Sequence, residues 1–155
     1  MVSQDYEDLF RVLNAHKIKY LVVGAHAVVF YTVPRFTKDL DVWIPPALND
    51  ATQIYEALKA FGAPLRDLTV EDFQNTSTLL QIGVAPVRID IMLAVPGISW
   101  EQAWKHRRRS RYGKTPIHIL GFSELVQAKK AANRPQDRLD LKKLSSKRKL
   151  RQGYA

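Results

Sequence analysis

The chain of 155 residues contains no cysteine. This absence excludes a disulfide framework, a thiolate nucleophile and a zinc site with cysteine ligands. Long apolar runs are also missing: the longest candidate, residues 20–29, is interrupted by Gly24 and His26, and a bilayer requires about 20 apolar residues. Residues 1–8 lack the basic and apolar regions of a signal peptide. The sequence therefore predicts a cytoplasmic protein with no membrane partner.

Apolar residues, by contrast, are plentiful, and charge is unevenly distributed. The hydrophobic fraction of 46% is enough to build one buried core and disfavours intrinsic disorder. Residues 1–104 carry 8 basic and 12 acidic side chains, whereas residues 105–155 carry 16 basic and 3 acidic ones. This asymmetry favours carboxylates gathered for a metal or general base in one part, and attraction of a polyanion such as a nucleotide or RNA by the other. A solvated basic face is the alternative.

Hydrophobic spacing and turn residues predict the secondary structure. Helices are expected over residues 5–15, 25–31, 49–61, 100–104, 123–132 and 136–144, and strands over residues 19–23, 38–44, 78–82, 87–93 and 117–120. Residues 65–78 are open between a loop and a short helix. The order predicts an α/β (α+β) fold, in which a small mixed β-sheet is flanked by helices and the C-terminal part is helical. We expect one domain over residues 1–144 and a flexible basic tail over residues 145–155.

Two acids stand close together in an apolar strand. Asp39 and Asp41 are two positions apart, so both carboxylates project from one face of the sheet. At ~4 Å and an effective dielectric constant near 20, like charges repel by roughly 4 kcal/mol, which a raised pKa, a basic partner or a divalent cation must relieve. Asp90 lies between isoleucines in a second strand. Carboxylate oxygens of this kind suit magnesium or manganese.

The acids also have a structural interpretation, in which they cap strand ends or pair with Arg35, Lys38 and Arg88. The four histidines form no metal-binding pair. Gly24 lies at a strand-to-helix turn, where the missing side chain lets backbone N–H groups approach a phosphate. Close packing is the alternative for this glycine, and the chain contains no P-loop string.

Three short motifs follow one another at a recognisable spacing. They are Val23-Gly24-Ala25, then, after thirteen residues, Asp39-Leu40-Asp41, and later Ile89-Asp90-Ile91. Together they resemble the signature of the polymerase-beta-type nucleotidyltransferase superfamily. The surrounding stretches, residues 20–27, 34–41 and 129–137, are similar to compact bacterial members grouped with the abortive-infection (type IV) toxins.

The resemblance implies a nucleotidyltransferase-like fold and an enzyme that transfers an NMP from an NTP to an acceptor hydroxyl, releasing pyrophosphate. It implies that Asp39, Asp41 and Asp90 are catalytic and bind two Mg²⁺ or Mn²⁺ ions, which stabilise the attacking and leaving oxygens. Gly24 and Ala25 would hold phosphate oxygens through their backbone N–H groups. Ala25 replaces the commoner Gly or Ser of the family, which removes a hydroxyl contact and leaves the backbone contact.

Further nucleotide contacts are expected on both sides of the acidic strands. By resemblance, Lys129 or Lys130 contacts the nucleotide phosphates, and the sequence leaves open which one. Asp137 and Asp140 lie where related toxins carry an acid that orients this lysine. Thr37 and Lys38 enter the acidic strand and are also candidates. The expected nucleotide-binding set is Gly24, Ala25, Thr37, Lys38, Lys129 and Lys130.

The basic part of the chain begins with an arginine-rich segment. Residues 105–114 contain six basic side chains, which suits salt-dependent contacts with RNA phosphates. A solvated connection before a strand is the alternative. Trp100 and Trp104, four positions apart, favour core packing over base stacking. The residues expected to contact nucleic acid are Arg107, Arg108, Arg109 and Arg111.

Two functional hypotheses follow. The first is a metal-dependent nucleotidyltransferase whose partners are an NTP and an acceptor, with RNA or tRNA to be tested first and an antitoxin protein as a further partner in a toxin–antitoxin system. The alternative is a catalytically weak nucleotidyltransferase-like module that binds RNA or a partner protein while the acids are structural. Base preference, acceptor identity and oligomeric state stay open at this point.

Overall fold

The computed structural model describes residues 3–32, 37, 39–45, 51–65, 67–74, 79–83 and 88–153, with the backbone alone for residues 147–153. The helices are α1 (Gln4–Ala15), α2 (Gly24–Tyr31), α3 (Ala51–Phe61), α4 (Trp100–Lys105), α5 (Phe122–Ala132) and α6 (Pro135–Gly153), with a short 3-10 helix, η1 (Val70–Gln74). The strands are β1 (Leu21–Val23), β2 (Asp39–Trp43), β3 (Leu79–Ile82), β4 (Arg88–Met92), β5 (Arg108–Tyr112) and β6 (Thr115–Ile119). No helix within these ranges is long and apolar enough to cross a membrane.

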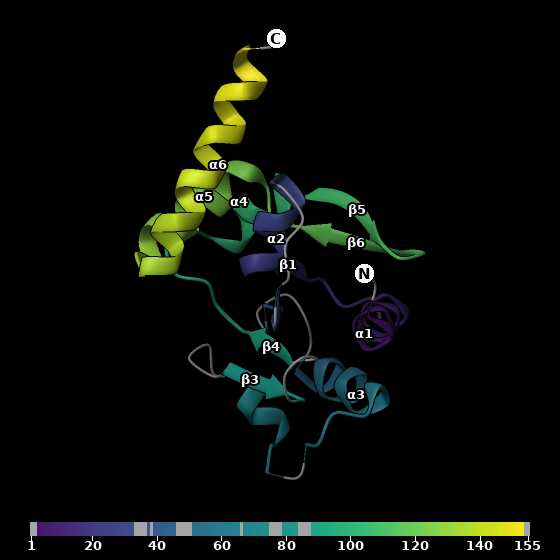
Figure 1. The fold of residues 1–155 in the computed structure, drawn as a ribbon. Coiled ribbons are helices and arrows are strands. Elements are labelled where there is room, and N and C mark those ends of the chain that lie inside the picture. The colour runs from purple at the N-terminus through teal and green to yellow at the C-terminus, as the bar shows by residue number, and fades with distance from the viewer. Residues whose placement is uncertain are drawn as a thin grey trace.

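The strands of the described ranges form one mixed six-stranded sheet in the order β3-β4-β2-β1-β6-β5 (Figure 1). β2 runs parallel to β4, and β1 runs parallel to β6, while the remaining neighbours are antiparallel. In this register Asp41 pairs with Val23 on one side and with Asp90 on the other. The expected mixed sheet flanked by helices is therefore confirmed, and its centre carries the acids.

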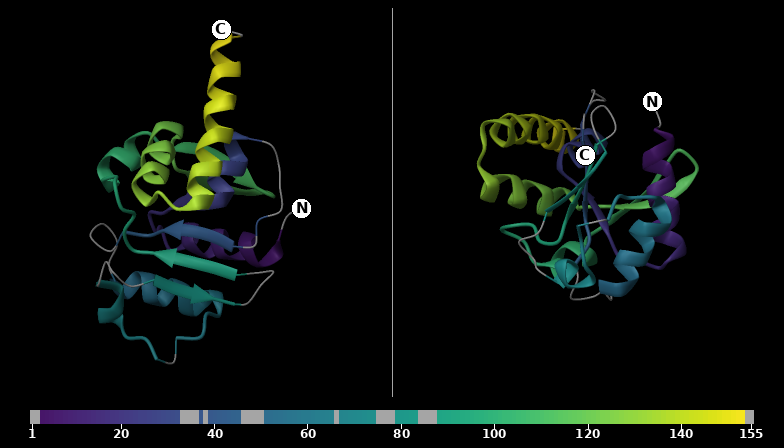
Figure 2. Two further views of the ribbon diagram at one scale, coloured as in Figure 1. Left: turned by 60° about the vertical axis from the view of Figure 1, so that its left-hand side comes forward. Right: turned by 90° about the horizontal axis from the view of Figure 1, so that it is seen from below.

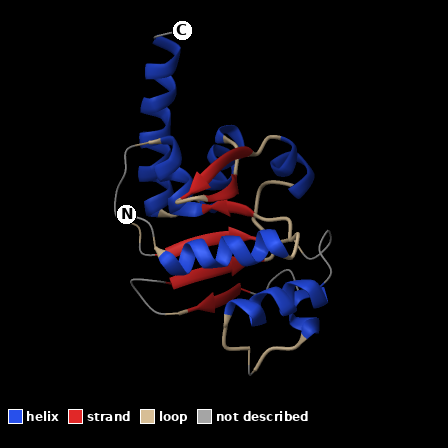
Figure 3. Cartoon of the chain, turned by 90° about the vertical axis from the view of Figure 1, so that its right-hand side faces the viewer, coloured by secondary structure: helices blue, strands red, loops and turns tan. Residues whose placement is uncertain are grey.

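Helices cover both faces of the sheet. α5 and α6 lie on one side of it, and α1 and α3 lie on the other (Figure 2). Figure 3 shows α1 lying over the strands, with α3 beside it. Because side chains alternate along a strand, Asp39 and Asp41 of β2 project toward the α5 side, and Leu40 and Val42 are buried on the α1 side.

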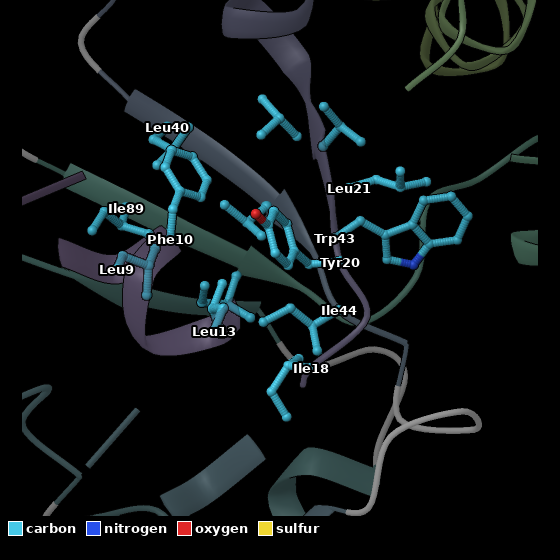
Figure 4. Close-up of a cluster of buried hydrophobic side chains, with 14 of the residues drawn as sticks. Leu9, Phe10, Leu13, Ile18, Tyr20, Leu21, Leu40, Trp43, Ile44 and Ile89 are labelled. Atoms are coloured by element: carbon cyan, nitrogen blue, oxygen red, sulfur yellow. The ribbon is translucent and has the colours of Figure 1, made fainter. Parts of the chain in front are cut away.

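The core on the α1 side explains why the N-terminal segment is helical. The buried residues of α1 recur at helical spacing and form an apolar stripe: Tyr6, Leu9, Phe10 and Leu13. The side chain of Ser3 accepts a hydrogen bond from the backbone N–H of Tyr6 and caps the helix. Phe10 stacks on Tyr20 with 5.7 Å between ring centroids, above Leu40 and Ile89 of the sheet (Figure 4).

One strand lies where none is expected from the sequence. The predicted strands leave a gap between residues 93 and 117, whereas residues 108–112 form the edge strand β5, which pairs with β6. Arg108, Arg109 and Arg111 are exposed there, so this strand shows no alternation of apolar and polar residues. Its pairing depends on the backbone and on the turn at Gly113, whose φ is +60°.

The C-terminal helix is longer than expected. The sequence predicts a helix that ends at residue 144, whereas the backbone of α6 stays helical to Gly153 and so runs through most of the expected flexible tail. The division into a domain of residues 1–144 and a tail stays a prediction. η1 lies within the open stretch of residues 65–78. Trp100 is buried and packs edge-to-face on Trp43, which confirms a core role for this tryptophan.

Candidate active site

The central strands bring four of the predicted site residues, Gly24, Asp41, Asp90 and Lys129, together around one cavity, whereas Asp39 is not in its wall. Val23, Asp41 and Asp90 lie side by side across β1, β2 and β4, and α5 covers them. The cavity has a volume of about 350 Å³. Its charged lining residues are Asp41, Asp90, Lys129, Arg134 and Asp137. Much of the remaining wall is apolar and comes from Met92, Val95, Pro96, Leu120, Leu125 and Ala128.

Gly24 is required where β1 passes into α2. Its φ of +67° favours glycine, and a Cβ atom at this position would overlap the carboxylate of Asp41. The packing interpretation of Gly24 is thus confirmed, and the glycine also brings the start of α2 against an acid. Val23 and Gly24 line the cavity at the start of α2, and the N-cap residue Val23 supplies no side-chain cap. The first N–H groups of a helix carry a partial positive charge.

The carboxylates repel one another, as their spacing predicts. Burial, followed by the nearby charges of Asp90 and Asp39, raises the pKa of Asp41 to about 7. A carboxyl with this pKa is only partly ionised at neutral pH. A positive charge beside these carboxylates would favour the ionised form of Asp41.

Arg88 supplies part of that positive charge. Its Nε donates to Oδ1 of Asp90 and its Nη2 to Oδ2 of Asp90, each over 3.2 Å. The same Nη2 lies 3.5 Å from Oδ2 of Asp39. The structural interpretation of the acids is therefore correct for Arg88, while Arg35 and Lys38 lie outside the described residues. Arg88 is expected as a partner of the acids but is not among the expected site residues, and its approach to Asp39 depends on the register of β2 and β4.

The structure distinguishes the two candidate lysines. Lys129 is buried and lines the cavity, with its Nζ 3.0 Å from Oδ1 of Asp137 and 3.2 Å from Oδ2 of Asp140. Lys130 is exposed and lies at a separate hollow beside Phe122. Lys129 is thus the lysine that faces the acids, and Asp137 and Asp140 hold its ammonium group.

Arg134 is a cavity residue that the sequence analysis missed. Its Nε donates to Oδ2 of Asp137 over 2.7 Å and its Nη2 to Oδ1 over 3.2 Å, and its backbone N–H also donates to Oδ2. The signal in the sequence is local: Pro135 suits the first turn of a helix, and an acid two residues later can cap the backbone in front of it. The sequence does not show that the capping residue, Asp137, also contacts Lys129.

The other expected residues lie at different distances from the cavity. Ala25 follows Gly24 in the first turn of α2, and the Oγ1 of Thr37 hydrogen-bonds with Nε2 of His26 over 2.7 Å. Neither is in the cavity wall formed by the described residues. Lys38 lies outside those residues. Arg107 packs over the ring of Trp104, 3.9 Å from its centroid, and is not among the residues that line the cavity.

The set Arg108, Arg109 and Arg111 does not join the cavity either. These residues lie on β5, and β1 and β6 separate that strand from β2. Three strand spacings correspond to roughly 14 Å. The structure therefore separates a central acidic cavity from a basic edge.

No protein-family model matches the chain, and no curated protein matches it by sequence. Solved structures do match. The lincosamide antibiotic adenylyltransferase LnuA, in its lincomycin-bound form, is 14% identical with a TM-score of 0.60, over 94% of this chain and 98% of that one. A Thermotoga maritima protein described as a nucleotidyltransferase is 18% identical with a TM-score of 0.56, over 99% and 95%. The antibiotic-resistance factor ANT(2'')-Ia is 10% identical with a TM-score of 0.57, over 97% and 90%.

The chain therefore has the fold of the nucleotidyltransferases, over nearly its whole length. One of these proteins is an adenylyltransferase and another is described as a nucleotidyltransferase, so the likeness supports the predicted fold. The closer resemblance to abortive-infection toxins stays a prediction, and so do the roles of the individual site residues.

The ion pairs around Lys129 predict a specific pH dependence of stability. Burial alone would raise the pKa of Asp137, but hydrogen bonds from Arg134 and Lys129 outweigh it and lower the pKa to about 2. A carboxyl whose pKa is lowered by folding stabilises the protein above its ordinary pKa, and this contribution is lost as the pH falls toward 2. We expect about 2 kcal/mol of the free energy of unfolding to be lost in this way between pH 5 and pH 2.

Chemical denaturation of the wild type and of Asp137→Asn across this pH range measures the effect. The variant should be less stable at neutral pH and lose less stability on acidification. Asp67→Asn, which removes an exposed carboxyl, is the control and should follow the wild type. An equal acid dependence in Asp137→Asn and the wild type would contradict the assignment.

Proposed function

We propose that the protein is a metal-dependent nucleotidyltransferase that moves an NMP from an NTP to an acceptor hydroxyl. The observation that carries the proposal is the placement of Asp41 and Asp90 in direct register, beside the uncapped start of α2 and opposite Lys129. Acids for metal ions, backbone N–H groups for phosphate and a buried lysine meet in one cavity. The shared fold supports the same reaction class.

The residues present fit divalent metal ions. The described residues form no group of three or more ligands that is already arranged around one ion. The donors are nevertheless hard carboxylate oxygens, and burial together with the charges of Asp90 and Asp39 raises the pKa of Asp41. Asp39, Asp41 and Asp90 would hold two Mg²⁺ or Mn²⁺ ions. When bound, such ions stabilise the attacking and leaving oxygens of phosphoryl transfer.

The chain's own groups bind the triphosphate and guide the reaction. The N–H groups of Gly24 and Ala25 donate to phosphate oxygens, and Lys129 contributes a cation from the opposite wall. Thr37 and Lys38 complete the proposed nucleotide contacts. The acceptor oxygen attacks the α-phosphorus, the bond from that phosphorus to the bridging oxygen breaks, and pyrophosphate leaves. Asp90 helps to remove the proton of the acceptor hydroxyl.

The first test concerns the acids. Asp41→Asn removes a proposed metal ligand and should lower NMP transfer from an α-labelled NTP by at least about 100-fold, while the circular dichroism spectrum is unchanged. Four labelled NTPs are screened against total RNA and against small molecules. Asp67→Asn, an exposed acid outside the cavity, should keep full activity. Full transfer by Asp41→Asn would contradict the proposal.

The second test uses the two neighbouring lysines as a matched pair. Lys129→Gln removes the cation that faces the acids and should weaken Mg²⁺–NTP binding by about tenfold, because it loses a charge-assisted phosphate contact. Lys130→Gln removes the same charge at an exposed position and should bind like the wild type. Isothermal titration calorimetry measures both, at a temperature at which Lys129→Gln is folded, since this variant leaves two buried acids unpaired. Equally weakened Mg²⁺–NTP binding in Lys129→Gln and Lys130→Gln would contradict the proposal that only Lys129 contacts the nucleotide.

For the acceptor we propose RNA, with tRNA as the first species to test. Residues 105–120 contain no acid, and the arginines of β5 are exposed along one edge of the sheet. Such an edge suits salt-dependent contacts with a phosphate backbone. We also propose that the protein is cytoplasmic and that an antitoxin protein is a further partner.

RNA binding by this edge is testable with charge-matched variants. The pair Arg109→Gln and Arg111→Gln should weaken RNA binding and lower the slope of log K against log salt by about 1 to 2, since about one counterion is released per phosphate contact. The pair Lys142→Gln and Lys143→Gln removes the same charge from exposed positions of α6 and is the control. Equal effects of the two pairs would mean that the edge does not bind RNA specifically.

A small molecule is the second candidate acceptor. LnuA is an adenylyltransferase of lincosamide antibiotics, and ANT(2'')-Ia was solved with adenylyl-2''-tobramycin. The apolar part of the cavity wall, which includes Met92, Val95 and Leu125, favours an acceptor with apolar surface. The catalytically weak binding module stays the alternative to both, and it predicts RNA binding without Asp41-dependent transfer.

A further inference from the structure

Arg88 is placed on the acids by the sheet itself. It pairs with Asp39 in the register of β2 and β4, and it lies two residues before Asp90 on β4. Residues at paired positions, and at alternate positions of one strand, share a face of the sheet. The strand positions therefore place the guanidinium group of Arg88 near the carboxylates of both Asp39 and Asp90, and its contacts with both are observed.

Arg88 is the member of the cluster with the longest side chain. The side chains of Arg88 and Asp39 are each 36% exposed, and that of Asp90 is 10% exposed. Arginine carries its charge at the end of a flexible stem, so the guanidinium can turn toward solvent, whereas an aspartate carboxylate stays close to the backbone of its strand. The length of this stem, together with its partial exposure, allows the cation to leave the acids.

Arg88 also occupies the oxygens that a metal ion would use. Its two donors engage both carboxylate oxygens of Asp90, and one of them also approaches Oδ2 of Asp39. A divalent cation that binds these oxygens meets the repulsion of a positive charge only a few ångströms away. At ~4 Å and an effective dielectric constant near 20 this is a strong opposing interaction.

We propose that Arg88 is a displaceable counter-cation of the acidic site, which stabilises the carboxylates without metal and competes with the divalent cation for Asp39 and Asp90. The inference rests on the proposed function in that it takes these acids as metal ligands. It adds that the affinity for metal is set by an arginine of this chain. A rigid Arg88 that only orients Asp90 has the opposite consequence, because its loss would weaken metal binding.

The test measures Mn²⁺ binding to the full chain without nucleotide, by electron paramagnetic resonance of the free ion. Arg88→Gln should bind Mn²⁺ about tenfold more tightly than the wild type, because the competing charge is gone. Arg88→Lys keeps the charge and loses the two-pronged contact, so its affinity should lie between the two. Arg138→Gln removes an exposed arginine of α6 and should bind like the wild type.

Thermal unfolding gives an independent readout. Without metal, Arg88→Gln should unfold at a lower temperature than the wild type, because the acids lose their counter-cation, and saturating Mn²⁺ should reduce this difference. If Arg88→Gln does not fold, Arg88→Lys carries both measurements.

The outcomes separate the inference from the proposed function. Mn²⁺ affinity that is unchanged or weaker in both Arg88 variants, with the wild type binding Mn²⁺, overturns the counter-cation and leaves the proposed function intact. Equal tightening in Arg138→Gln overturns it as well, because general charge would then explain the effect. A wild type and Arg88 variants that all fail to bind Mn²⁺ contradict the metal-dependent function itself.

Discussion

The mutual repulsion of carboxylates at the centre of the sheet is the constraint on which the site depends. Parallel pairing of β2 and β4 places Asp41 and Asp90 side by side, and burial prevents water from screening them. Residues on either side of Asp41 and Asp90 accommodate this repulsion. Arg88 bonds to Asp90 and approaches Asp39, and Gly24 leaves room for the carboxylate of Asp41. Burial and the charges of Asp90 and Asp39 still raise the pKa of Asp41.

A second set of charges faces the first across the cavity. Lys129 on α5 contacts Asp137 and Asp140 of α6, and Arg134 bonds to Asp137. These ion pairs join α5 to α6. The position of Lys129 therefore depends on how the two helices pack against each other. Breaking a buried pair of this kind leaves an unpaired charge and is costly. The two helices thus hold the ammonium group of Lys129 in the wall of the cavity that also contains Asp41 and Asp90.

Much of the fold is predictable from local pattern. The helices α1 and α4 begin after Ser3 and Ser99, which both cap them, and the acidic strands follow the alternation of side chains. β5 is not predictable in this way, because an exposed edge strand has no buried face to pattern its sequence. The continuation of α6 to Gly153 is likewise not marked by an apolar stripe, since most of its described side chains are exposed.

The sequence by itself determined which chemical groups the protein has: three acids in apolar strands, a glycine before a helix, a pair of adjacent lysines and a basic C-terminal part. It could do so because spacing along one strand or helix is a local property. Only the tertiary structure decided which of these groups meet. The register of β2 and β4 places Arg88 between two acids, and the packing of α5 and α6 turns Lys129 toward the cavity and leaves Lys130 exposed. These choices depend on contacts between segments far apart in the chain, which no local spacing encodes.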